Sequence, residues 1–315
     1  MSLAVNALLT EVFLSTLLFG AVTAGVPLLL AGLGEQISEK AGILNIGIEG
    51  MMLSGAYAGF VVAYKWDSFA LGFVAGGLAG MAVASLMALF CVRLSLNQIV
   101  VGIALTLSAE GLTALLHFFQ FSRSYPRLPK APALSIPGLD NISVLGPGLF
   151  RHNAIVYLAV LLVVIVAWLF RKTHIGLNLE AAGNRPAALD AAGIDVRTTR
   201  TAAVLTTGVL AGLGGAYMAE VGAGLFIPYM TNGAGFIAIV LAMLARGHPL
   251  WVLLGALLFG ASLSLTTALQ VAGVDIPTDV VQMLPFAMVI LVLVIFGRNS
   301  MLPPALGLPY IRGER

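Results

Sequence analysis

Charged residues are scarce in this sequence of 315 residues. Asp, Glu, Lys and Arg make up 10% of it, against roughly 25% in an average soluble domain. Hydrophobic residues make up 59%, and the mean hydropathy is +1.01. Such a small number of charged side chains cannot cover a globular surface. A soluble enzyme is therefore excluded. The formal net charge of +2 gives no reason to expect a nucleic-acid partner.

The sequence also lacks the residues that several kinds of site require. Its single cysteine, Cys91, cannot form an intramolecular disulfide, and no Cys/His spacing typical of a metal site surrounds it. None of the four lysines follows a glycine, so the Gly-Lys-Ser/Thr loop that cradles nucleotide phosphates is absent. We therefore expect no catalytic residue, no metal and no bound cofactor, and any ATP hydrolysis would take place in another subunit.

Apolar runs occupy most of the chain. They predict an all-α polytopic membrane protein, with about nine or ten transmembrane helices including broken or re-entrant ones, in a lipid bilayer whose apolar core is about 30 Å thick. We expect one transmembrane domain over residues 1–315. The run at 236–245 is short and follows a glycine-containing segment, which predicts one half of a broken or re-entrant helix. The runs lie at 12–34, 43–64, 69–92, 98–119, 154–170, 201–220, 236–245, 250–271 and 280–297.

Two polar segments interrupt these runs. Residues 171–200 carry eight of the thirty Asp, Glu, Lys and Arg residues, and placing them in the cytoplasm puts eleven of the sixteen Lys and Arg residues on that side. Cytoplasmic loops of membrane proteins are enriched in Lys and Arg. We therefore expect segment 171–200 to be cytoplasmic. The proline-rich segment 120–152 is then extracytoplasmic, as either a structured cap or a solvated connection.

Polar residues within the apolar runs are candidates for a translocation pathway, because such residues are costly in a bilayer. Asn45 and Glu49 are four residues apart and would share one face of a helix, either lining the path or joining two spans as a buried pair. Gln98 opens a span after Asn97, which we expect to cap the helix. Asn232 precedes the short run, as in the unwound joints of transporters. The candidates are Asn45, Glu49, Gln98 and Asn232.

A short amphiphilic helix is predicted within the polar segment 171–200. Pro186 suits the first turn of a helix, the alanine-rich residues that follow favour helix, and Gly193 suits its end. A simple connection between two spans needs no such helix, so we expect it to dock onto a soluble partner. The residues expected to make this contact are Pro186, Ala187, Asp190, Ala191 and Gly193.

Five segments resemble, in the same order, the motifs of one family of membrane proteins. Residues 42–52, Gly-Ile-Leu-Asn-Ile-Gly-Ile-Glu-Gly-Met-Met, are similar to the signature segment of permeases from bacterial ABC importers for branched-chain amino acids, simple sugars and nucleosides. The form Leu-Asn-Ile-Gly-x-Glu-Gly is typical of the nucleoside subgroup. Thr106 stands where that subgroup has an asparagine. Further motifs of the subgroup resemble residues 97–105, 183–196, 231–238 and 303–310.

The resemblance implies a type II ABC importer permease that forms half of a path for ATP-driven nucleoside uptake across the bacterial inner membrane. The chain is similar to the shorter of two different permeases. Three partners are implied: the second permease, an ABC ATP-binding subunit that holds ATP and Mg, and an extracytoplasmic substrate-binding protein. Segment 183–196 is similar to the family's coupling loop, which docks onto the ATPase.

Two alternatives stay open. A permease of the same family for simple sugars or branched-chain amino acids would have the same fold and coupling. A proton-driven secondary transporter would use Glu49, Glu110 and Glu220 as a relay, because intramembrane carboxylates commonly carry protons in such proteins.

Overall fold

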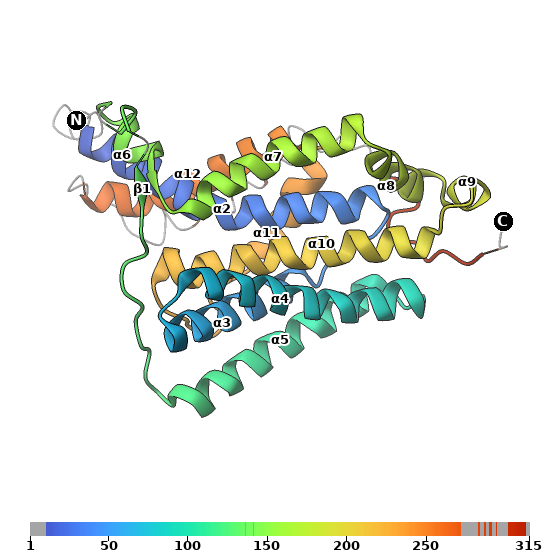
Figure 1. The fold of residues 1–315 in the computed structure, drawn as a ribbon, viewed down its shortest axis with the longest axis horizontal. Coiled ribbons are helices and arrows are strands. Elements are labelled where there is room, and N and C mark those ends of the chain that lie inside the picture. Colours follow the sequence, from blue (N-terminus) through green and yellow to red (C-terminus); the bar gives the residue numbers. More distant parts are fainter. Residues whose placement is uncertain are drawn as a thin grey trace.

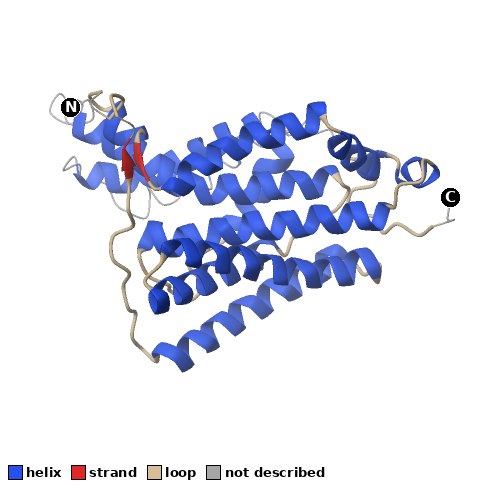
Figure 2. Ribbon diagram, viewed as in Figure 1, coloured by secondary structure: helices blue, strands red, loops and turns tan. Residues whose placement is uncertain are grey.

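The computed structural model describes residues 11–135, 137–140, 142–271 and 302–312, and five single positions between 283 and 294. These residues are mostly helical (Figure 2), which confirms the predicted all-α class. The two strands found among them, β1 (Leu134–Ser135) and β2 (Arg151–His152), form one short antiparallel pair. The predicted run at 280–297 lies almost wholly outside the described residues.

The long helices run roughly parallel to one another (Figure 1), in the order that the apolar runs predict. Among the described residues, five helical segments are long and apolar enough to cross a membrane. They are α2 (Glu11–Lys40), α4 (Phe69–Met87) with its π-helical continuation η1 (Ala88–Arg93), α5 (Gln98–Phe121), α7 (Ala154–Lys172), and α10 (Val196–Tyr217) with its π-helical continuation η2 (Met218–Ala223). The other helices are α3 (Ile48–Trp66), α6 (Leu145–Leu149), α8 (His174–Asn184), α9 (Pro186–Ala191), α11 (Ala234–Leu244) and α12 (Pro249–Val271).

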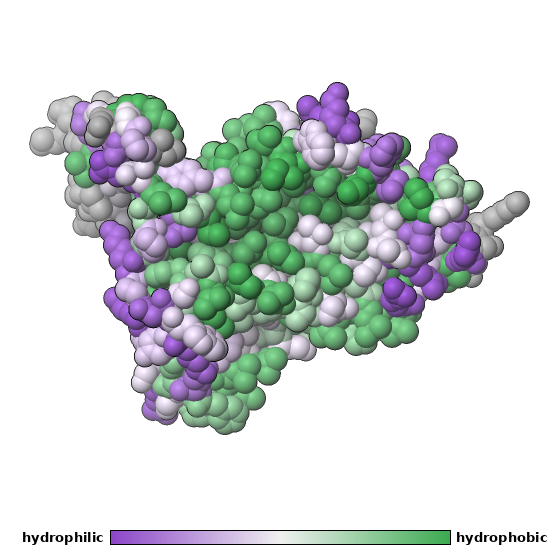
Figure 3. Space-filling view, viewed as in Figure 1, coloured by the Kyte–Doolittle hydropathy of each residue, from purple (hydrophilic) through white to green (hydrophobic). Residues whose placement is uncertain are grey.

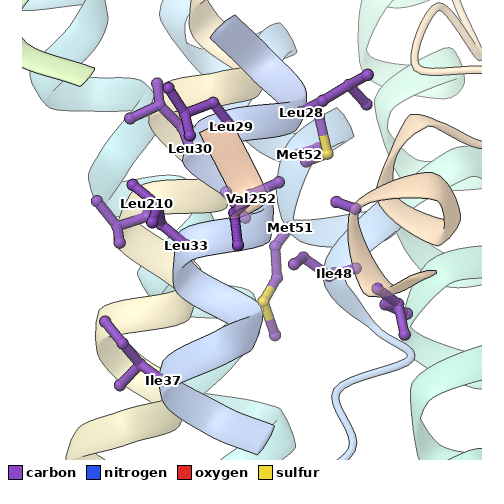
Figure 4. Packing of buried hydrophobic residues seen from close by; sticks show 14 of the residues in the cluster. Leu28, Leu29, Leu30, Leu33, Ile37, Ile48, Met51, Met52, Leu210 and Val252 are labelled. Atoms are coloured by element: carbon purple, nitrogen blue, oxygen red, sulfur yellow. The ribbon is translucent and has the colours of Figure 1, made fainter. Parts of the chain in front are cut away.

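The core lies where α2 packs against α3, α10, α11 and α12 (Figure 4). Leu33 of α2, Met51 of α3 and Val252 of α12 are fully buried there. Apolar side chains on α5 and α7 instead point outward, and Leu107 and Val164 are each 62% exposed. Figure 3 shows an apolar surface over the middle of the helices, with hydrophilic residues gathered toward both ends. This distribution suits a bilayer-spanning protein.

Glycines allow α3, α4 and α10 to approach closely. A Cβ atom on Gly55 would lie 2.7 Å from the carbonyl carbon of Gly212, and one on Gly76 would lie 3.0 Å from the carbonyl oxygen of Gly55. Small residues at such contacts let helix backbones pack against each other in a membrane, where the hydrophobic effect does not drive helices together. This contact fixes the position of α3, which carries part of the candidate site at its first turn.

The two polar segments lie at opposite ends of the helices (Figure 1). At one end, α6 packs against the start of α2, and a preceding extended stretch follows the end of α5. Segment 120–152 thus contains both an extended connection and a compact part. At the other end, α8 lies beside the end of α2, where Lys40 forms an ion pair with Glu180 at 2.9 Å, and α9 packs against α8.

Candidate functional site

Residues 41–47, which we call the signature loop, connect α2 to α3 without forming a helix, although five of the seven are buried. Buried backbone amides need hydrogen-bond partners, and two distant side chains supply them. The amide of Leu44 donates to Oε1 of Gln98 at 2.8 Å, and the amide of Asn45 donates to Oε1 of Glu35 at 3.0 Å. The signature loop is therefore held by α5 on one side and by α2 on the other.

The prediction that Asn45 and Glu49 share one helix face is wrong. The reversal of the chain between α2 and α3 occupies the whole signature loop, so α3 begins only at Ile48. Asn45 lies within this turn, and its Nδ2 donates to the sulfur of Met51 at 3.5 Å. Glu49 lies in the first turn of α3 and has different partners. The expected capping of α5 by Asn97 is confirmed, since its Oδ1 accepts the amides of Ile99 and Val100.

Glu49 binds the beginning of α11. Its Oε1 accepts the amide of Gly233 at 2.8 Å and its Oε2 accepts the amide of Gly235 at 2.6 Å. Gly233 itself caps α11 without a side chain, so Glu49 supplies the missing acceptor from another helix. The first amides of a helix carry a partial positive charge that favours a carboxylate. Glu49, which is 3% exposed, thus joins the first turn of α3 to the first turn of α11.

The chain is broken before α11, as the sequence predicts. Helix η2 ends at Ala223, and Asn232 and Gly233 have positive φ angles of 43° and 84°. α11 then runs for only 11 residues, which is about half of what a span requires. At its other end the broken segment is held by aromatic contacts, since the buried ring of Phe226 packs edge-on against Tyr57 at 5.2 Å.

The four pathway candidates occupy two kinds of position. Asn45, Glu49 and Gln98 are buried within the subunit, with at most 3% of each exposed, and they connect α2, α3, α5 and α11. Asn232 is exposed, next to the glycine that Glu49 binds. The structure thus brings Asn232 and Glu49 to one joint, and it places Asn45 in the signature loop, whose backbone Gln98 of α5 binds.

The predicted helix at Pro186 is present as α9. Pro186 lies in its first turn, and Gly193, with a φ of 85°, follows it. Ala187, Ala191 and Gly193 are exposed. Between them, Leu189 is buried with Ala182 and Val196.

Asp190 of α9 forms an ion pair at 3.1 Å with Arg312, which comes from the C-terminal segment. Beyond α9, Asp195 caps α10 by accepting the amides of Arg197 and Thr198. The hydroxyl of Thr198, followed by these amides, lowers the pKa of Asp195. The exposed face of α9 is thus presented on a helix whose other face is anchored.

Several buried polar residues were not predicted. Glu35 lies one residue beyond the predicted run 12–34, where a glutamate looks like the polar end of a span, and its partner Asn45 was assigned to a helix. Arg200 is the last residue of the predicted cytoplasmic segment 171–200, yet it is 2% exposed. Thr106, at the position where the nucleoside subgroup has asparagine, donates from its hydroxyl to the carbonyl of Ile46 at 3.5 Å. It therefore contacts the signature loop as well.

The three carboxylates of the relay alternative lie on different elements. Glu49 binds α11, while Glu110 is half-buried on α5. Glu220 is buried in η2, where its carboxylate lies against Gly59 and Gly72 and has no hydrogen-bond partner among the described residues. No hydrogen bond between described residues joins these carboxylates to one another.

Comparisons of the sequence with known proteins match it to one family. Residues 17–293 match the model of the permease component of branched-chain amino acid transport systems. The chain is 40% identical to the putative glucose ABC transporter permease protein TsgC13 of Haloferax volcanii, over 79% of this chain and 76% of that protein. It is 34% identical to the nucleoside ABC transporter permease protein NupC of Lactococcus lactis, over 91% and 94%. It is 31% identical to the guanosine ABC transporter permease protein NupQ of Bacillus subtilis, over 96% and 98%.

Each of these three organisms has a second, less similar relative, which in Haloferax volcanii is the glucose ABC transporter permease protein TsgB13, 31% identical to this chain. The second relative is named nucleoside ABC transporter permease protein NupB in Lactococcus lactis and guanosine ABC transporter permease protein NupP in Bacillus subtilis, and each of these two is 27% identical to this chain. The matched family model covers most of the chain, including the signature loop and the broken segment before α11. The chain therefore belongs to the family of permease components of branched-chain amino acid transport systems, and it is a multi-pass membrane protein of ABC transporters.

Proposed function

We propose that this permease forms half of the pathway of an ATP-driven importer for nucleosides. The assignment of the substrate rests on the similarity to two permeases named for nucleosides and guanosine. This similarity extends over more than nine tenths of both chains in each pair. Residues 44–50 support the same assignment, because their sequence has the form typical of the nucleoside subgroup.

The proposed mechanism is alternating access, in which ATP and the loaded binding protein favour different states of the pathway. The ATP-binding subunit would move α9 through its exposed residues Ala187, Ala191 and Gly193. That motion would reach the signature loop and, through Glu49, the first turn of α11. A broken helix is suited to this role, since its joint can change direction without breaking a continuous span.

The pathway residues divide by exposure in this proposal. Asn232, which is exposed at the joint, would offer its amide to the ribose or base of a passing nucleoside. Asn45, Glu49 and Gln98 are buried, and each would act by positioning the elements that border the path. Substitution of Asn232 should then change which nucleosides are taken up, whereas substitution of the buried three should change the rate for all of them.

The proposed partners are a second, different permease, an ABC ATP-binding subunit and an extracytoplasmic substrate-binding protein. The paired relatives support a heterodimer, because an organism with two such permeases can use one for each half of the path. We propose the bacterial inner membrane as the location, with α8 and α9 on the cytoplasmic side and α6 on the outer side.

The test is purification of the tagged chain from native membranes in mild detergent, followed by identification of its partners and uptake assays in the same cells. We expect recovery of a second permease and an ATP-binding subunit. We also expect uptake of labelled guanosine that is inhibited by unlabelled nucleosides and is lost in cells without this chain. A chain that purifies alone, in cells whose guanosine uptake responds only to the proton gradient, would favour the secondary transporter.

A simple sugar is the second candidate substrate. The relative named for glucose has the higher identity, although the match covers less of both proteins. In the same cells, loss of labelled glucose uptake, with guanosine uptake unchanged, would establish the sugar instead. Competition by leucine would indicate a branched-chain amino acid.

A further inference from the structure

A buried guanidinium connects three separate segments at the cytoplasmic end. Arg200, in the second turn of α10, donates from Nε to the carbonyl of Ala41 at 3.1 Å and from Nη2 to the carbonyl of Ala182 at 3.1 Å. It also donates from Nη1 to the carbonyl of Leu308 at 2.9 Å. No carboxylate pairs with it among the described residues. Its partners belong to the signature loop, to α8 and to the C-terminal segment.

The C-terminal segment, residues 302–312, is also held to α8 and to the signature loop by its own backbone. The amide of Ala305 donates to the carbonyl of Gly183 at 3.0 Å, and the amide of Gly307 donates to the carbonyl of Gly42 at 3.1 Å. Farther along, Tyr310 packs against the buried cluster that Leu189 of α9 forms with Ala182 and Val196. This segment therefore spans the distance between α9 and the signature loop.

Gly42 shows how closely these parts fit together. Its φ of 85° is in the left-handed region that favours glycine. A Cβ atom there would lie 2.9 Å from Nη2 of Arg200, 3.1 Å from Cα of Gly183 and 3.2 Å from the carbonyl oxygen of Ala305. Any other side chain at this position would push the guanidinium or the C-terminal segment away.

We infer that Arg200 and residues 302–312 form a clamp that couples α9 to the signature loop, with Arg200 as a positioning residue for transport. The inference rests on the proposed function, because it assigns a route to the motion that the ATPase starts. The route has two physical steps. The buried face of α9 packs with Ala182, which is a partner of Arg200, and with Tyr310, which belongs to the clamp, so a displacement of α9 moves both. Arg200 in turn joins α8, the C-terminal segment and Ala41 of the signature loop through the three hydrogen bonds of its guanidinium.

The route continues through the contacts of the signature loop. Glu35 and Gln98 hold its amides, and Glu49 follows in α3 and binds the start of α11. A buried arginine with carbonyl partners would also contribute to stability alone, so position between two sites is not evidence of coupling. The two roles differ in one measurable quantity, the number of substrate molecules taken up per ATP hydrolysed.

The test uses the purified complex with its second permease, ATP-binding subunit and binding protein in proteoliposomes. Arg200→Lys keeps the positive charge but loses the planar fork that reaches three carbonyls. Arg197→Lys, one turn earlier on α10, is the matched control. We expect Arg200→Lys to hydrolyse ATP within about twofold of the wild type but to take up at least about tenfold fewer substrate molecules per ATP, and Arg197→Lys to change neither.

A wild-type ratio in Arg200→Lys would overturn the inference. If this variant does not assemble, Tyr310→Ala decides, because Tyr310 lies at the edge of the clamp and is partly exposed. Its ratio should fall severalfold, and an unchanged ratio would likewise refute the clamp. The proposed substrate is tested separately in the wild type. Absence of nucleoside uptake there removes the nucleoside assignment, whereas the ratio for whichever substrate is taken up still tests Arg200.

Discussion

Replacement of Glu49 by glutamine tests the joint at the start of α11. The carboxylate accepts two amides at 2.6 and 2.8 Å. Glutamine has nearly the same shape but only one acceptor oxygen, and its NH₂ group would face an amide hydrogen. The change therefore removes one charge-assisted hydrogen bond and the attraction between the carboxylate and the positive end of the helix.

The size of the effect follows from these two losses. A hydrogen bond to a charged group contributes about 1.5–3 kcal/mol, and a carboxylate at a helix N-terminus adds about 0.5–1 kcal/mol. The free energy of local opening at the start of α11 should therefore fall by about 2–4 kcal/mol, and amide hydrogen exchange there should accelerate about 30- to 1,000-fold.

The assay is hydrogen–deuterium exchange of peptides covering residues 231–240, with the protein in detergent or nanodiscs. Glu110→Gln is the matched control, because the Glu110 carboxylate makes no hydrogen bond or ion pair with the described residues. We expect Glu49→Gln to raise exchange in this peptide while α10 stays protected, and Glu110→Gln to have no such effect. Equal protection of residues 231–240 in Glu49→Gln and wild type would refute the assignment of Glu49.

Three further predictions concern packing, docking and pH. Gly212→Ala should destabilise the chain by about 1–3 kcal/mol and lower its melting temperature, because the new Cβ would enter the backbone of α4. Gly111→Ala, with open space around it, should not. Equal melting temperatures of the two variants would contradict the close contact. Ala191→Arg, on the exposed face of α9, should abolish co-purification of the ATP-binding subunit. Ala133→Arg, exposed at the opposite end, should preserve it. Equal recovery of the ATP-binding subunit with both variants would argue against docking at α9. A threonine hydroxyl and two amides lower the pKa of Asp195 in the folded state, so its stabilisation is complete above about pH 4 and is lost as the pH falls through the lower folded-state value. Protection factors at the start of α10 should then fall on acidification in the wild type but not in Asp195→Asn, which caps without titrating, and the same pH dependence in both would refute this role.

The helices were predictable because a long apolar run in a membrane must satisfy its backbone internally. The break before α11 was also predictable, since Asn232 and Gly233 favour positive φ angles. The helix at Pro186 followed from proline and glycine at its two ends. All of these features depend on residues that are neighbours in the sequence.

The buried contacts of the site were not predictable, because each joins distant residues. In the sequence, the signature loop looks like part of an apolar span. Only the folded chain shows that the side chain of Gln98, 54 residues away, binds the backbone of Leu44. Glu49 is separated from Gly235 by 186 residues. Arg200 resembles any other cytoplasmic arginine, and only the folded chain shows that it binds three carbonyls. Spacing along one helix therefore suggests Asn45 as the partner of Glu49. In the fold, Asn45 instead binds Met51, and Glu49 binds the amides of Gly233 and Gly235.

The central claim is ATP-driven nucleoside uptake through a complex that contains this permease. The most direct test encloses ATP in proteoliposomes that carry the purified complex and supplies labelled guanosine and the binding protein outside. The account predicts that guanosine accumulates only with ATP, that other nucleosides compete, and that glucose and leucine do not. Accumulation that is independent of ATP and stops when the proton gradient is dissipated would contradict it, as would ATP-dependent uptake of glucose without any uptake of guanosine.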